Sequence, residues 1–120
     1  MIPIEDIRVG NLVMLYGSIA TVQRSDFSET EHGIAIDSGL PIEIDKDWLL
    51  DADFIYNETL NTFHIGNFII VDFKYLGDSR ACDFGLVINL KHVPILYVHQ
   101  LQNLYYDLQG AKLNFKNKNR

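Results

Sequence analysis

Short runs of apolar residues recur over the first two thirds of the chain, some of them continuous and some alternating with polar residues, and this pattern predicts β-strands. Two pairs of such runs each flank a turn that contains glycine. The four predicted strands are residues 12–16, 19–23, 33–37 and 40–44, with turns at Gly17-Ser18 and Ser38-Gly39. The second pair is predicted to form a hairpin. Short strands and glycine turns indicate a small, curled, SH3-like sheet, and an open meander is the alternative.

The middle of the chain combines one short helix with further strands. Asp45 is a favourable N-cap residue, so residues 46–51 are predicted to form a helix of about two turns, with Trp48 and Leu49 covering the sheet. Further strands are predicted at residues 54–56, 62–65, 68–75 and 83–90. The last two are expected to be antiparallel partners, connected across residues 77–80.

Near the C-terminus apolar residues recur every three or four positions, which is typical of an amphipathic helix. They are Tyr97, Val98, Leu101, Leu104, Tyr105 and Leu108, with Gly110 as the stop. The opposite face holds His99, Gln100, Gln102, Asn103, Tyr106 and Asp107. The predicted fold is therefore α+β, mostly antiparallel β, with a short central helix and a C-terminal helix packed on the sheet. Residues 1–111 are expected to form a single domain, and residues 112–120 a basic, frayed tail.

Composition agrees with one ordinary folded domain. The 120 residues are 48% hydrophobic and 12% aromatic, enough to bury one core, which excludes a disordered chain and a multidomain enzyme. Apolar runs are only as long as strands and no signal-peptide pattern is visible, so no membrane contact is expected and the cytoplasm is the expected location. Cys82 is the only cysteine, which excludes an intrachain disulfide.

Charge is unevenly distributed along the chain. Residues 26–58 hold ten acidic residues against one basic residue, Lys46, whereas the last nine residues hold four basic residues and no acid. The whole chain has a formal net charge of −6, and removing the four positive charges of the tail leaves −10 on the body. A body this acidic repels phosphate backbones, so nucleic-acid binding across the main surface is not expected. The same acidic excess leaves one alternative function open, an acidic nucleic-acid mimic that inhibits a DNA-binding protein.

Residues capable of catalysis or metal binding occur without a supporting motif. The histidines, which have no metal-ligand spacing, are His32, His64, His92 and His99. His64 is predicted to lie on the more solvent-exposed face of a strand, and His92 is predicted to precede a loop. Asp83 disfavours a thiolate at Cys82. No catalytic residue, cofactor or metal is therefore predicted; a small enzyme or metal protein whose site forms only in three dimensions is the remaining alternative.

One stripe of the terminal helix is the candidate site. It consists of His99, Gln102, Asn103 and Tyr106, which follow the spacing i, i+3, i+4, i+7 and so lie along one line beside the buried face. Tyrosine supplies a large contact area at low entropic cost. The stripe predicts docking of an unknown protein partner or a second copy of the chain, with a merely solvated polar face as the alternative. The expected function is a non-enzymatic binding or accessory module that acts through protein–protein contacts.

Residues 98–106, followed by Gly110, resemble the C-terminal helix of a group of small uncharacterised proteins from prophages and mobile elements of Bacteroides-type bacteria. Residues 7–13 and 42–50 resemble the start and the middle of the same group. The chain differs from the group at Ala111-Lys112, where acidic residues are common, and at Ala52-Asp53, where glycine often follows the helix. The resemblance implies an origin in a bacterial mobile element, and it implies no catalytic residue.

Overall fold

The computed structural model describes residues 2–3, 7–30, 33–36, 39–72, 84–88 and 91–116. The strands in this part of the chain are β1 (Ile2–Pro3), β2 (Leu12–Leu15), β3 (Ser18–Thr21), β4 (Phe27–Thr30), β5 (Gly33–Ile36), β6 (Gly39–Leu40), β7 (Ile55–Asn57), β8 (Thr62–Ile65), β9 (Phe68–Asp72), β10 (Phe84–Ile88) and β11 (Lys91–Ile95). The helices are α1 (Lys46–Asp51) and α2 (Val98–Gln109), and η1 (Arg24–Asp26) is a single 3₁₀ turn.

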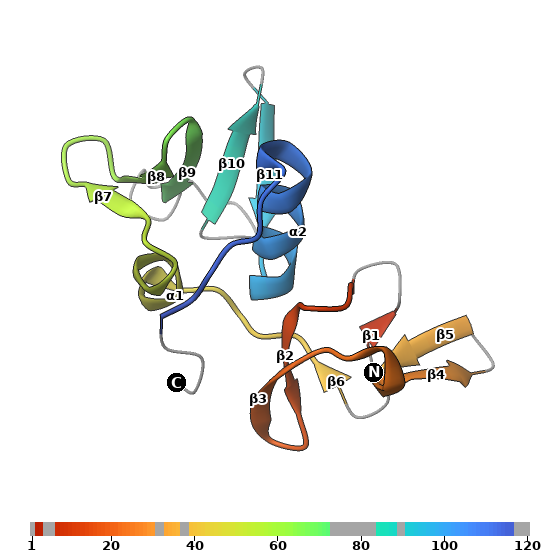
Figure 1. Cartoon of the computed structure of the whole chain (residues 1–120). Coiled ribbons are helices and arrows are strands. Elements are labelled where there is room, and N and C mark those ends of the chain that lie inside the picture. The colour runs from red at the N-terminus through yellow and green to blue at the C-terminus, as the bar shows by residue number, and fades with distance from the viewer. Residues whose placement is uncertain are drawn as a thin grey trace.

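The predicted α+β class is confirmed. The strands form three antiparallel sheets, in the orders β1-β5-β4, β3-β2-β6 and β11-β10-β9-β8-β7. Figure 1 shows β1 to β6 together at one end of an elongated molecule, and α1, α2 and the five-stranded sheet at the other. After α2 the chain runs back to α1. No helix in the described part of the chain is long and apolar enough to cross a membrane.

The main core lies between the five-stranded sheet and the two helices. Residues directly opposite one another on neighbouring strands point to the same face, and one such row consists of Tyr56, Phe63, Ile70, Leu86 and Val93. Three members of this row are buried, and they pack in one cluster with the buried apolar residues of α1 and α2. Burial of this apolar surface therefore attaches both helices to a single face of the sheet.

Strand β2 connects this core to a smaller one at the N-terminal end. Leu12 belongs to the main cluster, whereas its neighbour Val13 is fully buried in a second cluster with Ile7 and Val22. Adjacent residues of a strand point to opposite faces, so β2 is covered on both sides.

Helix α1 forms as predicted. The Asp45 side chain accepts a hydrogen bond of 3.0 Å from the Trp48 N–H, and Trp48 and Leu49 are both buried. This cap satisfies one of the amide groups that have no partner within the first turn of a helix.

Helix α2 confirms most of the predicted amphipathic pattern. Val98 and Leu101 are buried, Tyr106 is exposed, and Gly110 ends the helix in the left-handed conformation with φ of 70°. Leu108 is an exception, because 49% of its surface is exposed although it is in helical phase with Leu101. The main core, which buries Leu101, does not extend to the last turn of the helix.

The predicted hairpin of residues 33–37 and 40–44 is wrong. Strand β5 pairs with β4 and β1, whereas β6 is only two residues long and pairs with β2 in another sheet. Pro41 follows β6 and has no N–H to extend the ladder. Ile42 is buried, and Glu43 forms an isolated bridge with Tyr97 instead of continuing a strand.

The pairing of the two long middle strands is confirmed, with Phe84 opposite Asp72. Their predicted extensions, together with the connecting residues 77–80, lie outside the described residues. His92 does not precede a loop, because it lies within β11. That strand is at the edge of the sheet, where Pro94 is tolerated.

The expected frayed tail is wrong for residues 112–116. Leu113 and Phe115 are buried, and the Phe115 ring packs edge-on against Trp48, with 5.4 Å between the ring centroids. The Lys116 N–H donates to the Asp51 carbonyl at 3.0 Å. Two apolar side chains spaced two apart therefore anchor this segment on α1, in spite of its basic composition. Residues 117–120 lie outside the described residues.

Candidate ligand cleft between the N-terminal loop and helix α2

The loop before β2 is organised by the side chain of Asn11. Its Oδ1 accepts a 2.7 Å hydrogen bond from the Arg8 N–H, and its own N–H donates to the Arg8 carbonyl at 3.0 Å. Asparagine favours such turns because its side chain imitates a backbone group. Gly10 supplies the positive φ of 96° that the turn requires. Hydrogen bonds of Gly10 and Asn11 with Val22 then tie the loop to the residue after β3.

Two amide side chains of α2 hold this loop. Asn103 Oδ1 accepts from Asn11 Nδ2 at 2.9 Å, across 92 residues of sequence. Gln102 Oε1 accepts from the Leu12 N–H at 2.8 Å, and Gln102 Nε2 donates to the Gly10 carbonyl at 3.4 Å. We call these contacts of Gln102 and Asn103 with residues 10–12 the amide clasp. The clasp supplies hydrogen-bond partners to polar groups of a loop that is partly shielded from water. A group left without a partner there would lower the stability of the folded protein.

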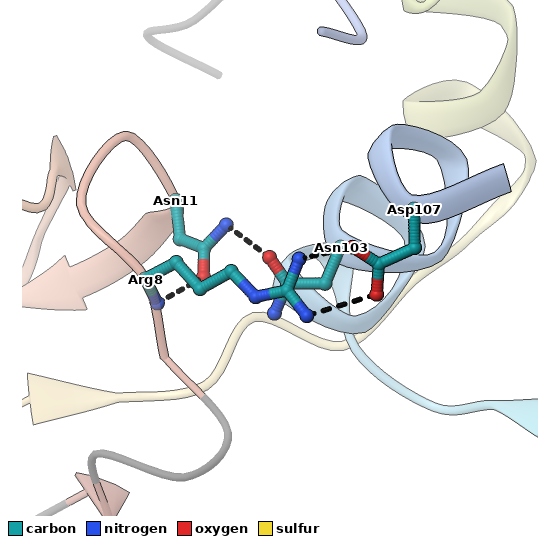
Figure 2. Close-up of polar contacts among 4 residues, drawn as sticks. All are labelled: Arg8, Asn11, Asn103 and Asp107. Carbon is teal, nitrogen blue, oxygen red and sulfur yellow. Dashed lines mark hydrogen bonds and ion pairs between the residues drawn. The ribbon is translucent and has the colours of Figure 1, made fainter. Parts of the chain in front are cut away.

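An ion pair lies beside the clasp, one helical turn further along α2. The Arg8 guanidinium donates two hydrogen bonds to the Asp107 carboxylate, at 2.7 and 2.9 Å (Figure 2). Hydrogen bonding from Arg8 lowers the pKa of Asp107, and the same bond raises the pKa of Arg8. Both side chains are about half exposed, so the pair orients the loop on α2 more than it stabilises the fold.

A cleft of about 390 Å³ opens where the loop, α2 and the C-terminal segment meet. The lining residues are Arg8, Val9, Gly10, Asn11, Leu12, Thr21, Gln102, Asn103, Tyr106, Lys112, Leu113, Asn114 and Phe115. Three of the apolar members, Leu12, Leu113 and Phe115, are buried, whereas Val9, Tyr106 and Lys112 are exposed. The cleft thus combines a buried apolar part with cationic, amide and hydroxyl groups nearer the solvent, as ligand sites commonly do.

Three of the four predicted contact residues line this cleft. Tyr106 is 49% exposed, whereas Gln102 and Asn103 are half-buried because the amide clasp engages them within the chain. The prediction that His99 lies on the outward stripe is wrong. His99 is only 2% exposed, and its ring stacks on the Tyr97 ring with 5.7 Å between centroids and 7° between planes.

The other wall of the cleft was not predicted from the sequence. Arg8 and Asn11 come from the start of the chain, and Lys112 and Phe115 come from the segment expected to be a frayed tail. The Gly10-Asn11 pair was a local signal for a turn. No pattern in the sequence connects that turn to α2.

The described residues hold no recognisable metal site. Among them, no group of three or more His, Cys, Asp or Glu side chains is placed to hold a metal ion. His64 is half-buried on the face of the sheet opposite the core, in one row with the exposed Ile55 and Ile69. Cys82 and His32 lie outside the described residues.

The acidic excess of residues 26–58 is partly visible around α1. Asp45 and Asp47 are exposed at the start of the helix, and Glu43 precedes them. Ion pairs join Asp53 to Lys116 at 2.7 Å and Asp72 to Lys46 at 3.9 Å. The Asp53 carboxylate holds the pKa of Lys116 above its usual value through a hydrogen bond.

Comparison with protein-family models, with curated proteins and with solved structures gave no match for this chain. The cleft is therefore interpreted from its own residues and geometry.

Proposed function

We propose that the protein is a non-enzymatic binding module that holds a segment of a partner protein in the cleft between the N-terminal loop, α2 and residues 112–115. The observation that carries the proposal is that segments from both ends of the chain build one cleft with a buried apolar part and with Tyr106 exposed beside it. Exposed tyrosines next to apolar pockets are typical anchors of protein interfaces.

The chemistry of the lining favours binding over catalysis. Among the described residues, those that line the cleft include no histidine, cysteine, serine, aspartate or glutamate. General acid–base and nucleophilic catalysis mostly use such side chains in pairs within hydrogen-bond reach. The lining amides include Gln102 and Asn103, which already recognise the backbone and an amide side chain of the protein's own loop. Asn114, which lines the cleft and is exposed, offers an amide of the same kind to the backbone of another polypeptide.

Affinity capture with cleft variants tests the proposal. The tagged full chain is compared with Tyr106→Ala and Lys112→Ala, each of which removes an exposed side chain from the cleft. Leu60→Ala is the matched control, since Leu60 is also exposed, lies in the turn between β7 and β8 and is not among the residues that line the cleft. A partner retained by the wild type and the control, and reduced about tenfold or more by the cleft variants, is the expected result. Equal recovery by all four proteins would contradict the proposal.

A second candidate, the acidic mimic of nucleic acid, is favoured by the exposed carboxylates of Glu43, Asp45 and Asp47 at one end of α1. Such a mimic would bind a basic protein, and its affinity would fall steeply as salt increases. The cleft variants would leave that binding unchanged, which separates it from the leading proposal.

The resemblance of residues 98–106 supports a further proposal, that the chain belongs to a bacterial prophage or mobile element and acts in the cytoplasm. The SH3-like shape of the N-terminal strands also stays a proposal. Identification of the genes beside the coding sequence tests the first of these.

A further inference from the structure

The cleft differs from the rest of the protein in charge. The whole chain has 16 acidic and 10 basic residues. The described residues that line the cleft, however, include the cations Arg8 and Lys112 and no carboxylate. The carboxylate of Asp107 is bound to Arg8, and Asp107 is not among the lining residues. A negatively charged group is therefore repelled less here than over the acidic residues around α1.

Donor groups suited to a carboxylate converge on the same cleft. The arginine side chain carries about five N–H donors, and two of those on Arg8 are used by Asp107. That bidentate contact holds the guanidinium in place while leaving other donors available. Lys112, Tyr106 and Asn114 line the same space, and their side chains carry an ammonium, a hydroxyl and an amide donor.

The buried part of the cleft argues for an organic acid in preference to an inorganic anion. Leu113 and Phe115 are both buried, and they line the cleft together with Leu12. A compact anion such as phosphate makes no use of apolar contacts. The methylene stem of a glutamate, or an aliphatic residue next to it, removes such surface from water while the carboxylate stays near the cations.

We infer that the cleft recognises an acidic segment of its partner protein, with a glutamate carboxylate held by Lys112, Tyr106 and the Arg8 guanidinium and a neighbouring apolar side chain on Leu113 and Phe115. The inference rests on the proposed function, because it names the chemistry of the partner that occupies the same cleft.

Two matched peptides test the inference on the full chain. One is acetyl-Gly-Glu-Leu-Gly-amide, and the other replaces glutamate with glutamine, so the two differ only in the carboxylate. Binding is followed by changes in the backbone amide NMR signals during titration. We expect saturable shifts for residues 8–12, 106 and 112–115, and about tenfold weaker binding of the glutamine peptide, because one charge-assisted contact is lost. Lys112→Gln should reduce this preference, and Leu60→Ala should preserve it.

The two proposals can fail separately. Equal binding of the two peptides, or shifts confined to residues outside the cleft, would overturn the carboxylate inference even if a partner protein is captured through the cleft. Conversely, if the glutamate peptide binds in the cleft with the expected preference but no captured protein depends on the cleft, the carboxylate selectivity of the cleft stands, whereas the proposed function, a partner protein held there, fails. An unchanged preference in Lys112→Gln would also count against the inference.

Discussion

Replacing Asn11 with alanine should weaken the connection between the N-terminal strands and α2. Asn11 is 4% exposed, and its side chain makes two hydrogen bonds, one with the Arg8 N–H and one with Asn103. The Asn11→Ala variant loses both. Each such bond contributes a net 0.5–1.5 kcal/mol, so we expect a loss of about 1–3 kcal/mol in the free energy of unfolding. Loss of Asn103 leaves the buried Asn11 amide without that acceptor, at a cost of about 1–3 kcal/mol.

A double-mutant cycle isolates the direct contact. If the 2.9 Å hydrogen bond between Asn11 and Asn103 links the loop before β2 to α2, the double variant Asn11→Ala/Asn103→Ala should lose less free energy of unfolding than the two single variants lose in sum. The expected coupling is about 0.5–1.5 kcal/mol. Asn67→Ala is the matched control, because Asn67 is exposed in the turn between β8 and β9 and should change stability by less than about 0.5 kcal/mol.

Urea unfolding measures these differences with two probes. Trp48 is the only tryptophan and is buried in the main core, so its fluorescence reports on the part that contains α1 and α2. Far-UV circular dichroism reports on all strands and helices, and coincident transitions indicate that both parts unfold together. A coupling of zero within error, or an Asn11→Ala variant as stable as Asn67→Ala, would refute the role of the clasp.

Three further predictions concern α2 and the C-terminal segment. Leu101→Ala, at a fully buried position, should cost about 2–5 kcal/mol by urea unfolding, whereas Leu108→Ala should cost far less because that side chain is half exposed. Phe115→Ala should cost about 3–5 kcal/mol and shift the tryptophan emission, whereas a variant as stable as the wild type would mean that the segment is not anchored. Asp107→Asn should be less stable than the wild type at neutral pH. Arg8 lowers the pKa of Asp107 in the folded protein, so the difference in the free energy of unfolding between wild type and variant is fully present above the unfolded-state pKa of about 3.9. It disappears as the pH falls through the lowered pKa of the folded protein. A difference independent of pH would contradict the ion pair.

Much of the secondary structure follows from local sequence. The burial of Leu101 and the exposure of Tyr106 follow from apolar residues at helical spacing, and Gly110 marks the end of the helix because it adopts a left-handed conformation easily. The Asp45 cap is equally local, since donor and acceptor are three residues apart. Each of these features depends on neighbours within about one helical turn, and a single sequence contains that information.

The pairing of the strands and the cleft depend on contacts between distant residues, which only the tertiary structure determines. The partners of β5 and β6 could not be read from their alternation, because the same pattern suits either sheet. His99 is expected to be exposed from its place on the helix, but it is 2% exposed and its ring stacks on that of Tyr97. Asn11 and Asn103 are 92 residues apart, and their contact exists because the cores on both sides of β2 bring the loop to α2. The sequence by itself thus determined the local elements and their apolar faces, and packing of those faces decided which polar residues meet in the cleft.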